Sequence, residues 1–320
     1  MNRLMAEQVD HGGGIDAARA RFGGAREDWI DLSTGINPLP YPLPDLPGTA
    51  WTTLPDDDAH SALMEAARTF WNVPDQAAIL AAPGTSALIA RIPSLLPAER
   101  VFIPGPTYNE HARAFRAAGW VVSEDDDAEA LVAVHPNNPD GRLWRNVDAR
   151  PLTVIDESFA DTAPDQSLIG LTTRPGTLIL KGLGKFWGLA GLRLGFVIGD
   201  PSMIAHLSTM LGPWPVSGPA LAIGAAALTD AAWASATRTR LARDCARLDA
   251  MMTGAGATLV GGTALFRLFD TPDATRWQES LARHRIWTRV FPYSHRWMRL
   301  GLPDRADHWQ RLTIALEDMK

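Results

Sequence analysis

Short apolar runs alternate with helical patterns along residues 77–199, and this alternation restricts the chain to few folds. Several runs are continuously apolar, which is typical of strands buried on both faces of a sheet. Strands that alternate with helices, here at Ser86–Leu95 and Thr107–Ala118, predict an α/β fold with a mostly parallel sheet. The predicted strands are Ala78–Ala82, Arg100–Ile103, Trp120–Ser123, Ala130–Val134, Leu152–Ile155, Thr177–Leu180 and Leu192–Ile198.

The pattern changes after Gly199. A Pro- and Gly-rich stretch at residues 211–219 precedes an Ala-, Arg- and Leu-rich helical region at residues 220–252. Short strands and two helices follow, which predicts a smaller α+β domain. They are expected at Thr258–Val260, Ala264–Phe269, Ala274–Arg283, Ile286–Val290, Trp297–Leu300 and Ala306–Met319. We expect an N-terminal segment (1–50) that packs with the small domain, a large domain (51–214) and a small C-terminal domain (215–320).

Composition excludes several classes of protein. A chain of 320 residues is long enough for about two domains. Its net charge of −6 disfavours a nucleic-acid partner. No apolar run is long enough to cross a membrane, and the first residues lack the apolar core of a signal peptide, so the expected location is the cytoplasm. The single cysteine, Cys245, excludes a disulfide framework and a Cys-rich metal site; it is either a nucleophile or a small residue on a helix.

The 30 basic residues include only three lysines: Lys181, Lys185 and Lys320. An arginine cannot replace a lysine whose amine must lose its proton and attack a carbonyl, because guanidinium stays charged. An Arg-rich genome would explain why lysine is scarce. It would not explain the segment in which Lys185 lies.

That segment runs from Leu178 to Phe196 as LILKGLGKFWGLAGLRLGF. An apolar strand leads to Lys185, a Gly- and Ala-rich turn follows, and Arg193 lies in the next strand. Apolar surroundings lower the pKa of a lysine and favour Schiff-base formation, and the guanidinium of Arg193 suits a phosphate.

The segment resembles the Lys-x-x-Gly-Leu-Ala-Gly-x-Arg-x-Gly signature of fold-type-I enzymes that use pyridoxal phosphate (PLP), in the class I/II aminotransferase family. The resemblance implies that Lys185 carries PLP as a Schiff base and that Arg193 binds its phosphate. Lys181 has no arginine at the matching distance.

Two further motifs have the order expected in that family. Pro83-Gly84-Thr85-Ser86 follows a strand and opens a helix, where backbone N–H groups can bind a phosphate; such a sequence is also a plain helix cap. Pro106-Thr107-Tyr108 resembles the place where an aromatic ring stacks on the pyridine ring, although a lone tyrosine is more often a core residue.

Two polar residues complete the resemblance. In Asn137-Asn138-Pro139-Asp140-Gly141, the family pattern implies that Asn138 donates to the O3′ oxygen of PLP, although Asn-Pro-Asp-Gly is also simply a good turn. Asp156 ends a buried strand and is expected to pair with the pyridine nitrogen, which keeps the ring protonated and electron-withdrawing. A capping role is the alternative for Asp156.

Other stretches resemble the threonine-phosphate decarboxylases of cobalamin biosynthesis. They are His11-Gly12-Gly13-Gly14, residues 31–38 (DLSTGINP), Phe159 where aminotransferases usually have tyrosine, and residues 213–217 (PWPVS). Two phosphate donors common among relatives are missing, since Gly182 replaces a serine or threonine and Leu54 replaces a tyrosine. Thr85, Ser86 and Arg193 are therefore expected to hold the cofactor phosphate.

The same resemblance implies a phosphorylated amino acid as substrate and a homodimer. Arg299 matches the arginine that binds the substrate carboxylate, Arg289 is a second candidate, and His11 is expected to contact the substrate phosphate. Asn138 is also expected to bind the substrate. For the arginines the alternative is a solvated surface role, and for His11 it is a flexible terminus.

The expected activity is PLP-dependent decarboxylation of O-phospho-L-threonine to (R)-1-amino-2-propanol phosphate. The main alternative is a PLP-dependent aminotransferase, such as one acting on histidinol phosphate. A third class, a PLP-binding sensor without catalysis, is disfavoured because Lys185, Asp156 and Arg193 are all present.

Overall fold

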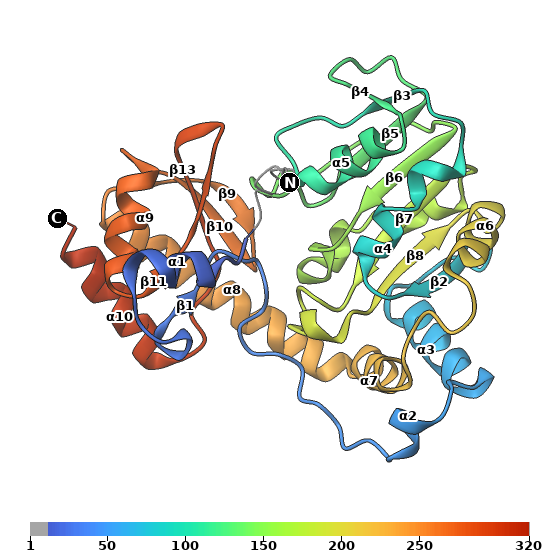
Figure 1. Ribbon diagram of the computed structural model, residues 1–320, viewed down its shortest axis with the longest axis horizontal. Helices are drawn as coiled ribbons and strands as arrows, with labels where there is room; N and C mark the ends of the chain where they lie inside the picture. The colour runs from blue at the N-terminus through green and yellow to red at the C-terminus, as the bar shows by residue number, and fades with distance from the viewer. Residues whose placement is uncertain (1–11, 320) are drawn as a thin grey trace, which may run out of the picture. The chain divides into compact units, whose positions relative to one another are not determined.

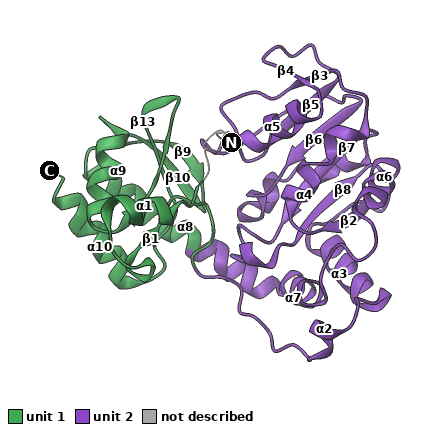
Figure 2. Cartoon of the chain, viewed as in Figure 1, with its two compact units in different colours: residues 1–38, 241–320 green, residues 39–240 purple. Residues whose placement is uncertain are grey.

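The computed structural model describes residues 12–319, and the chain divides into two compact units (Figure 2). The large unit comprises residues 39–240, and the small unit comprises residues 1–38 together with 241–320. These divisions differ from the boundaries expected after residues 50 and 214. The second lies inside helix α8 (Ala231–Gly254), which is continuous there, so no turn residue marks it in the sequence.

A seven-stranded sheet forms the centre of the large unit, in the order β2-β8-β7-β6-β5-β3-β4 (Figure 1). Only β8 runs antiparallel to its neighbours, so the predicted mostly parallel α/β sheet is confirmed. The strands are β2 (Ala78–Ala82), β3 (Arg100–Phe102), β4 (Val121–Ser123), β5 (Ala130–Val134), β6 (Leu152–Asp156), β7 (Thr177–Gly182) and β8 (Gly195–Gly199).

Helices bury the apolar side chains of this sheet on both faces. Leu88, Phe115 and Leu207, from three different helices, pack in one core with Val154 and Val197. Ile155 and Ile179 point to the other face because side chains alternate along a strand. The helices are α2 (Thr49–Thr52), α3 (Asp57–Phe70), α4 (Thr85–Ile89), α5 (Asn109–Ala117), α6 (Pro201–Leu211) and α7 (Gly218–Thr229), with short 3-10 turns at Ile92–Leu95, Ala160–Thr162, Pro164–Gln166, Ile169–Thr173 and Ala190–Leu192.

The strand directions bring functional segments to one edge of the sheet. The parallel strands β2, β5, β6 and β7 all end there, and β8 begins there. Ligands in such sheets bind beyond the carboxyl ends of the strands. Most of the candidate cofactor-binding motifs of the sequence lie directly after these strands or directly before β8.

The small unit is an α+β structure with two sheets. Strands β9 (Thr258–Thr263), β10 (Phe266–Asp270), β12 (Arg289–Phe291) and β13 (Ser294–Leu300) form an antiparallel sheet in the order β12-β13-β10-β9. Strand β1 (Ile30–Asp31) pairs in parallel with β11 (Ile286–Trp287). The helices are α1 (Ile15–Phe22), α9 (Ala274–Arg283) and α10 (Ala306–Glu317), with a 3-10 turn at Arg26–Asp28.

The helical region at residues 220–252 consists of two helices, α7 and α8. Asp230 has non-helical dihedral angles (φ −91°, ψ 73°), and its carboxylate accepts a hydrogen bond from the Trp233 backbone N–H at 2.9 Å. Aspartate is a favoured N-cap, so this residue ends one helix and starts the next. Among residues 12–319, no helix combines the length and apolar character that a membrane span requires.

Candidate active site

A cavity of about 240 Å³ lies at the carboxyl edge of the large sheet. The structure brings together there every residue that the sequence predicts to bind the cofactor. These are Gly84, Thr85, Ser86, Tyr108, Asn138, Asp156, Lys185 and Arg193. They come from six separate stretches of the chain, which the strand order of the sheet makes neighbours.

Asp156 is the last residue of β6 and is almost fully buried, with 3% of its surface exposed. One carboxylate oxygen lies 2.8 Å from His111 Nε2, and the other accepts hydrogen bonds from the Ser158 backbone N–H (2.9 Å) and hydroxyl (2.5 Å). Burial by itself raises the pKa of Asp156, but the hydrogen bond and charge of His111 and the bonds from Ser158 together lower it below its ordinary value. Asp156 is therefore an ionised carboxylate at neutral pH.

The sequence interpretation missed His111 and Ser158. His111 lies on α5, three residues after Tyr108, and is itself buried. Residues three apart share one side of a helix, so the Tyr108-x-x-His111 spacing is the signal that could have identified it. The ring of Tyr108 packs edge-on against His111 with centroids 6.0 Å apart.

Tyr108 remains a neutral phenol. Burial raises its pKa to about 12, and the nearby charges of Asp156 and Glu110 raise it further than Arg193 lowers it. Tyr108 can therefore stack the face of its neutral ring on a bound aromatic ring, and such stacking is favourable.

Lys185 lines the cavity from a compact turn after β7. The Gly188 N–H donates to the Lys185 carbonyl at 3.1 Å, and the Leu189 N–H donates to the Leu183 carbonyl at 3.0 Å. The Lys185 amine lies 5.4 Å from the centre of the Phe159 ring. Phe159 thus places an aromatic ring beside the amine at the wall of the cavity.

Lys181 lies outside this cavity. It precedes Gly182, which lines the cavity, and alternation along β7 places the two on opposite faces. The Lys181 amine pairs with Glu157 at 2.5 Å and lies 3.7 Å from Asp161, and both carboxylates are buried. Of the two interior lysines, only Lys185 therefore meets the cavity.

Arg193 lies against the backbone at the start of α4. A Cβ at Gly84 would lie 2.7 Å from Arg193 Nη2, so a side chain at position 84 would displace the guanidinium from this place. Arg193 has left-handed backbone angles (φ 53°, ψ 49°), a costly conformation for a residue with a side chain. Thr85 and Ser86 add hydroxyl and backbone donors, so the set suits a dianionic phosphate.

The two positions that lack a phosphate donor, Gly182 and Leu54, lie in different surroundings. Gly182 lines the cavity, and a Cβ there would lie 3.3 Å from the methyl group of Thr85, which packs against this glycine. Leu54 is exposed, with 66% of its surface accessible. Thr85 therefore takes up part of the space that a larger residue at position 182 would need.

Two neighbouring asparagines differ in their surroundings. Asn138 lines the cavity. Asn137 is buried in a network, in which its amide donates to the Pro106 carbonyl (3.0 Å) and to Asp140 (2.8 Å), while its oxygen accepts from Thr107 (2.6 Å). Asn137 thus fixes the turn that places Asn138.

The predicted substrate residues belong to the small unit. Arg299 on β13 is buried and donates to the Ser33 carbonyl at 2.7 Å, and it pairs in register with Arg289 on β12. Arg289 and the backbone of Gly13 and Gly14 line a second cavity of about 630 Å³. His11 lies outside the described residues. The glycine segment after His11 and the two arginines therefore lie in the same unit.

Cys245 is the small buried residue on a helix that one interpretation expected. Its thiol contacts the Thr263 carbonyl at 3.6 Å, and burial raises its pKa to about 12. A thiol that stays protonated is a poor nucleophile.

Residues 27–316 match the family model of the class I and II aminotransferases. The chain belongs to this family. A threonine-phosphate decarboxylase of a Sinorhizobium species is 44% identical over 99% of this chain and 100% of that protein. The threonine-phosphate decarboxylase of Pseudomonas aeruginosa is 36% identical over 98% of each.

A solved structure has the same fold as this chain. The histidinol-phosphate aminotransferase from Sinorhizobium meliloti, in complex with pyridoxal-5′-phosphate, has a TM-score of 0.78 to this aminotransferase-family chain, with 18% identity over 96% of this chain and 94% of that one. At that identity the likeness shows the fold, which is the fold-type-I architecture predicted from the sequence.

PLP is the cofactor of this family, and the cavity fits it. An ionised carboxylate, an amine beside an aromatic ring and a guanidinium seated on a glycine surround one space. These are the groups needed for a ring nitrogen, an aldehyde and a phosphate respectively.

Proposed function

We propose that this chain decarboxylates O-phospho-L-threonine to (R)-1-amino-2-propanol phosphate, a step of cobalamin biosynthesis. The observation that carries the proposal is the match of almost the whole chain to two threonine-phosphate decarboxylases at 44% and 36% identity. The catalytic residues are Lys185 and Asp156, and the cytoplasm is the expected location.

The large unit is the cofactor-binding domain in this proposal. Thr85, Ser86 and Arg193 hold the phosphate, Tyr108 packs on the ring, and Asn138 donates to the ring oxygen. When bound, PLP supplies an electron-withdrawing ring that accepts the electron pair of a broken Cα bond.

Two residues manage protons. Asp156 stays ionised because of His111 and Ser158, so it holds a proton on the ring nitrogen. Lys185 would hold the cofactor aldehyde through its amine, and that amine, when free, would deliver a proton to the substrate Cα.

The choice of bond depends on how the substrate is held. The bond that breaks is the one perpendicular to the cofactor ring, so the carboxylate must be held in that direction. In the small unit, Arg289 and Arg299 supply guanidinium groups and Gly13 and Gly14 supply backbone near one cavity. Together with His11, these groups suit a substrate that carries both a phosphate and a carboxylate.

The deciding experiment follows both products of the two possible reactions. PLP-loaded protein is incubated with O-phospho-L-threonine, and CO₂ and the amino alcohol phosphate are quantified. The same protein is incubated with histidinol phosphate and a keto acid to detect amino transfer, with Lys185→Ala as the blank. CO₂ release without amino transfer supports the decarboxylase. Amino transfer without CO₂ release would establish the aminotransferase, whose fold the chain shares.

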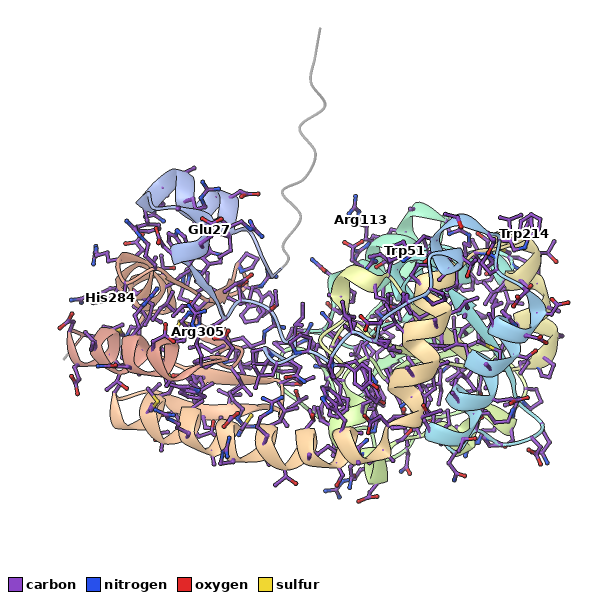
Figure 3. The ribbon with its side chains drawn as sticks, turned by 90° about the horizontal axis from the view of Figure 1, so that it is seen from below. Glu27, Trp51, Arg113, Trp214, His284 and Arg305 are labelled. Atoms are coloured by element: carbon purple, nitrogen blue, oxygen red, sulfur yellow. The ribbon has the colours of Figure 1, made fainter. Side chains whose placement is uncertain are left out.

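We also propose a homodimer. The large unit exposes apolar side chains in residues 43–54 and at Trp214, including Trp51 at 69% and Trp214 at 58% exposure (Figure 3). A second copy of the chain is the partner that would cover them. Light scattering at micromolar concentration should give twice the mass of one chain. An active protein with the mass of a monomer would contradict the proposal.

A further inference from the structure

A buried group of charged side chains lies outside the cavity and has no role in the chemistry described so far. Glu157 follows Asp156 directly, and Lys181 precedes the cavity residue Gly182, so both side chains point to the opposite face of the sheet. Asp161 joins them from the turn after β6. All three are at least 95% buried.

These side chains are closely connected. The Lys181 amine pairs with Glu157 at 2.5 Å, and Glu157 also accepts hydrogen bonds from the Ser167 hydroxyl (2.6 Å) and the Leu168 N–H (2.5 Å). Lys181 also lies 3.7 Å from Asp161. Charges removed from water are costly unless they are paired in this way, so the group has a definite geometry.

Asp161 reaches the turn that carries Lys185. Its carboxylate accepts hydrogen bonds from two indole N–H groups, Trp71 at 2.9 Å and Trp187 at 3.1 Å. Trp187 lies two residues after Lys185 and is fully buried. Its ring stacks on Trp233 with centroids 5.1 Å apart, so the indole has little freedom to move.

The turn with Lys185 is therefore held on both sides by the turn that begins at Asp156. Before Lys185, Lys181 is bound to Glu157; after it, Trp187 is bound to Asp161. The two turns supply the two groups that must act on one cofactor: the carboxylate for its ring nitrogen and the amine for its aldehyde.

Burial raises the pKa of Asp161, while Lys181, the two indoles and Arg238 oppose that rise. The Asp161 backbone carbonyl accepts a further hydrogen bond from Arg238 at 2.7 Å, which fixes the main chain as well as the side chain. Hydrogen bonds to a charged group are stronger than those between neutral groups, so this anchor resists displacement.

We propose that Asp161 is a positioning residue for Lys185: through the indole of Trp187, it holds the lysine amine where it can join a cofactor whose ring is held by Asp156. This rests on the proposed role of Lys185 as the lysine that carries PLP. The prediction concerns the covalent link, because Asp161 contacts the Lys185 turn through Trp187, whereas Thr85, Ser86 and Tyr108 meet the phosphate and ring from other segments.

Two ligands separate the covalent link from the other contacts. PLP can join a lysine, whereas pyridoxamine phosphate has the same ring and phosphate but an amine in place of the aldehyde. Dissociation constants for both are measured on the full chain, without substrate. Loss of one buried hydrogen bond that positions the lysine is expected to weaken its reaction with PLP by about tenfold. Asp161→Asn and Trp187→Phe should therefore weaken PLP about tenfold while pyridoxamine phosphate binding stays unchanged.

Trp71→Phe is the matched control. It removes an indole N–H from the same carboxylate, but Trp71 follows α3 and not the Lys185 turn. It should leave the ratio of the two affinities as in the wild type. Thermal unfolding of each variant shows whether it is folded. If Asp161→Asn does not fold, comparison of the affinity ratios of Trp187→Phe and Trp71→Phe is still a complete test.

The outcomes are distinct. If Trp71→Phe lowers the affinity ratio as much as Trp187→Phe, or if Asp161→Asn and Trp187→Phe both leave it unchanged, Asp161 has only a structural role and the inference is wrong. Borohydride reduction of wild-type protein with PLP checks the assumption beneath it. Failure to label Lys185 would overturn the proposed function itself.

Discussion

Replacement of Gly84 by alanine tests the phosphate site through its effect on the guanidinium of Arg193. The new Cβ would lie 2.7 Å from Arg193 Nη2, closer than atoms of this kind approach, so the guanidinium has to move. Loss of one charge-assisted contact costs about 1.5–3 kcal/mol, which corresponds to a roughly 10- to 150-fold rise in the Kd for PLP.

The same substitution has a second, separable effect. Gly84 has a φ of 88°, a region that alanine adopts at a cost of about 1–3 kcal/mol. That strain should lower the thermal stability of the protein without cofactor. Titration of PLP, followed by its visible absorbance, measures the first effect, and calorimetry without cofactor measures the second. Gly170→Ala is the control, because a Cβ there meets nothing within 4 Å and its φ is ordinary.

A double-mutant cycle decides whether Arg193 carries the effect. In an Arg193→Ala background, Gly84→Ala should cost little further PLP affinity, because the guanidinium that the methyl group displaces is already gone. An equal loss of affinity in both backgrounds would refute the reasoning, since Gly84 would then act on the cofactor by another route.

Further substitutions test the rest of the site. Lys185→Ala should abolish borohydride trapping of PLP, whereas Lys181→Met should retain it, and trapping of PLP on Lys181 would reverse the assignment. The Lys181→Met protein should also unfold at a lower temperature, because two buried carboxylates lose their cation and breaking such a pair costs about 3–5 kcal/mol. His111→Phe should raise the pKa of Asp156, so PLP affinity should decline as the pH falls from about 7 to about 5, a range in which the wild type keeps its carboxylate; identical pH profiles would show that His111 does not tune it. Arg299→Lys should slow phosphothreonine turnover by about one to two powers of ten, because an ammonium cannot reproduce the contacts of a guanidinium; unchanged turnover would remove Arg299 from the substrate site.

Most of the large sheet is predictable from the sequence, because its strands are short, continuously apolar and bounded by turn residues. Predicted Ala78–Ala82 and Ala130–Val134 coincide with β2 and β5. The region at residues 286–290 divides into β11 and β12, which join different sheets. That division depends on the pairing of β11 with β1 from the other end of the chain, and no local pattern reports it.

The site likewise contains some residues that the sequence predicts and others that it does not. Motifs with fixed spacing lead directly to residues such as Lys185 and Arg193, which line one cavity. The residues around them are harder to find. His111 and Asp161 resemble ordinary polar residues on a helix and in a turn, and their contacts with Asp156 and Trp187 form only when distant segments pack.

The parallel pairing of β1 with β11 has a consequence for synthesis on the ribosome. Residues 39–240 form an uninterrupted stretch, so the large unit, with β8 between β2 and β7, can assemble once residue 240 has emerged. The first 38 residues are made earlier, yet their strand finds its partner only when Ile286 and Trp287 appear. Strand β1 is thus made before the large unit but finds its partner after it, and the alternating prolines from Pro38 to Pro44 that follow β1 disfavour aggregation in the interval.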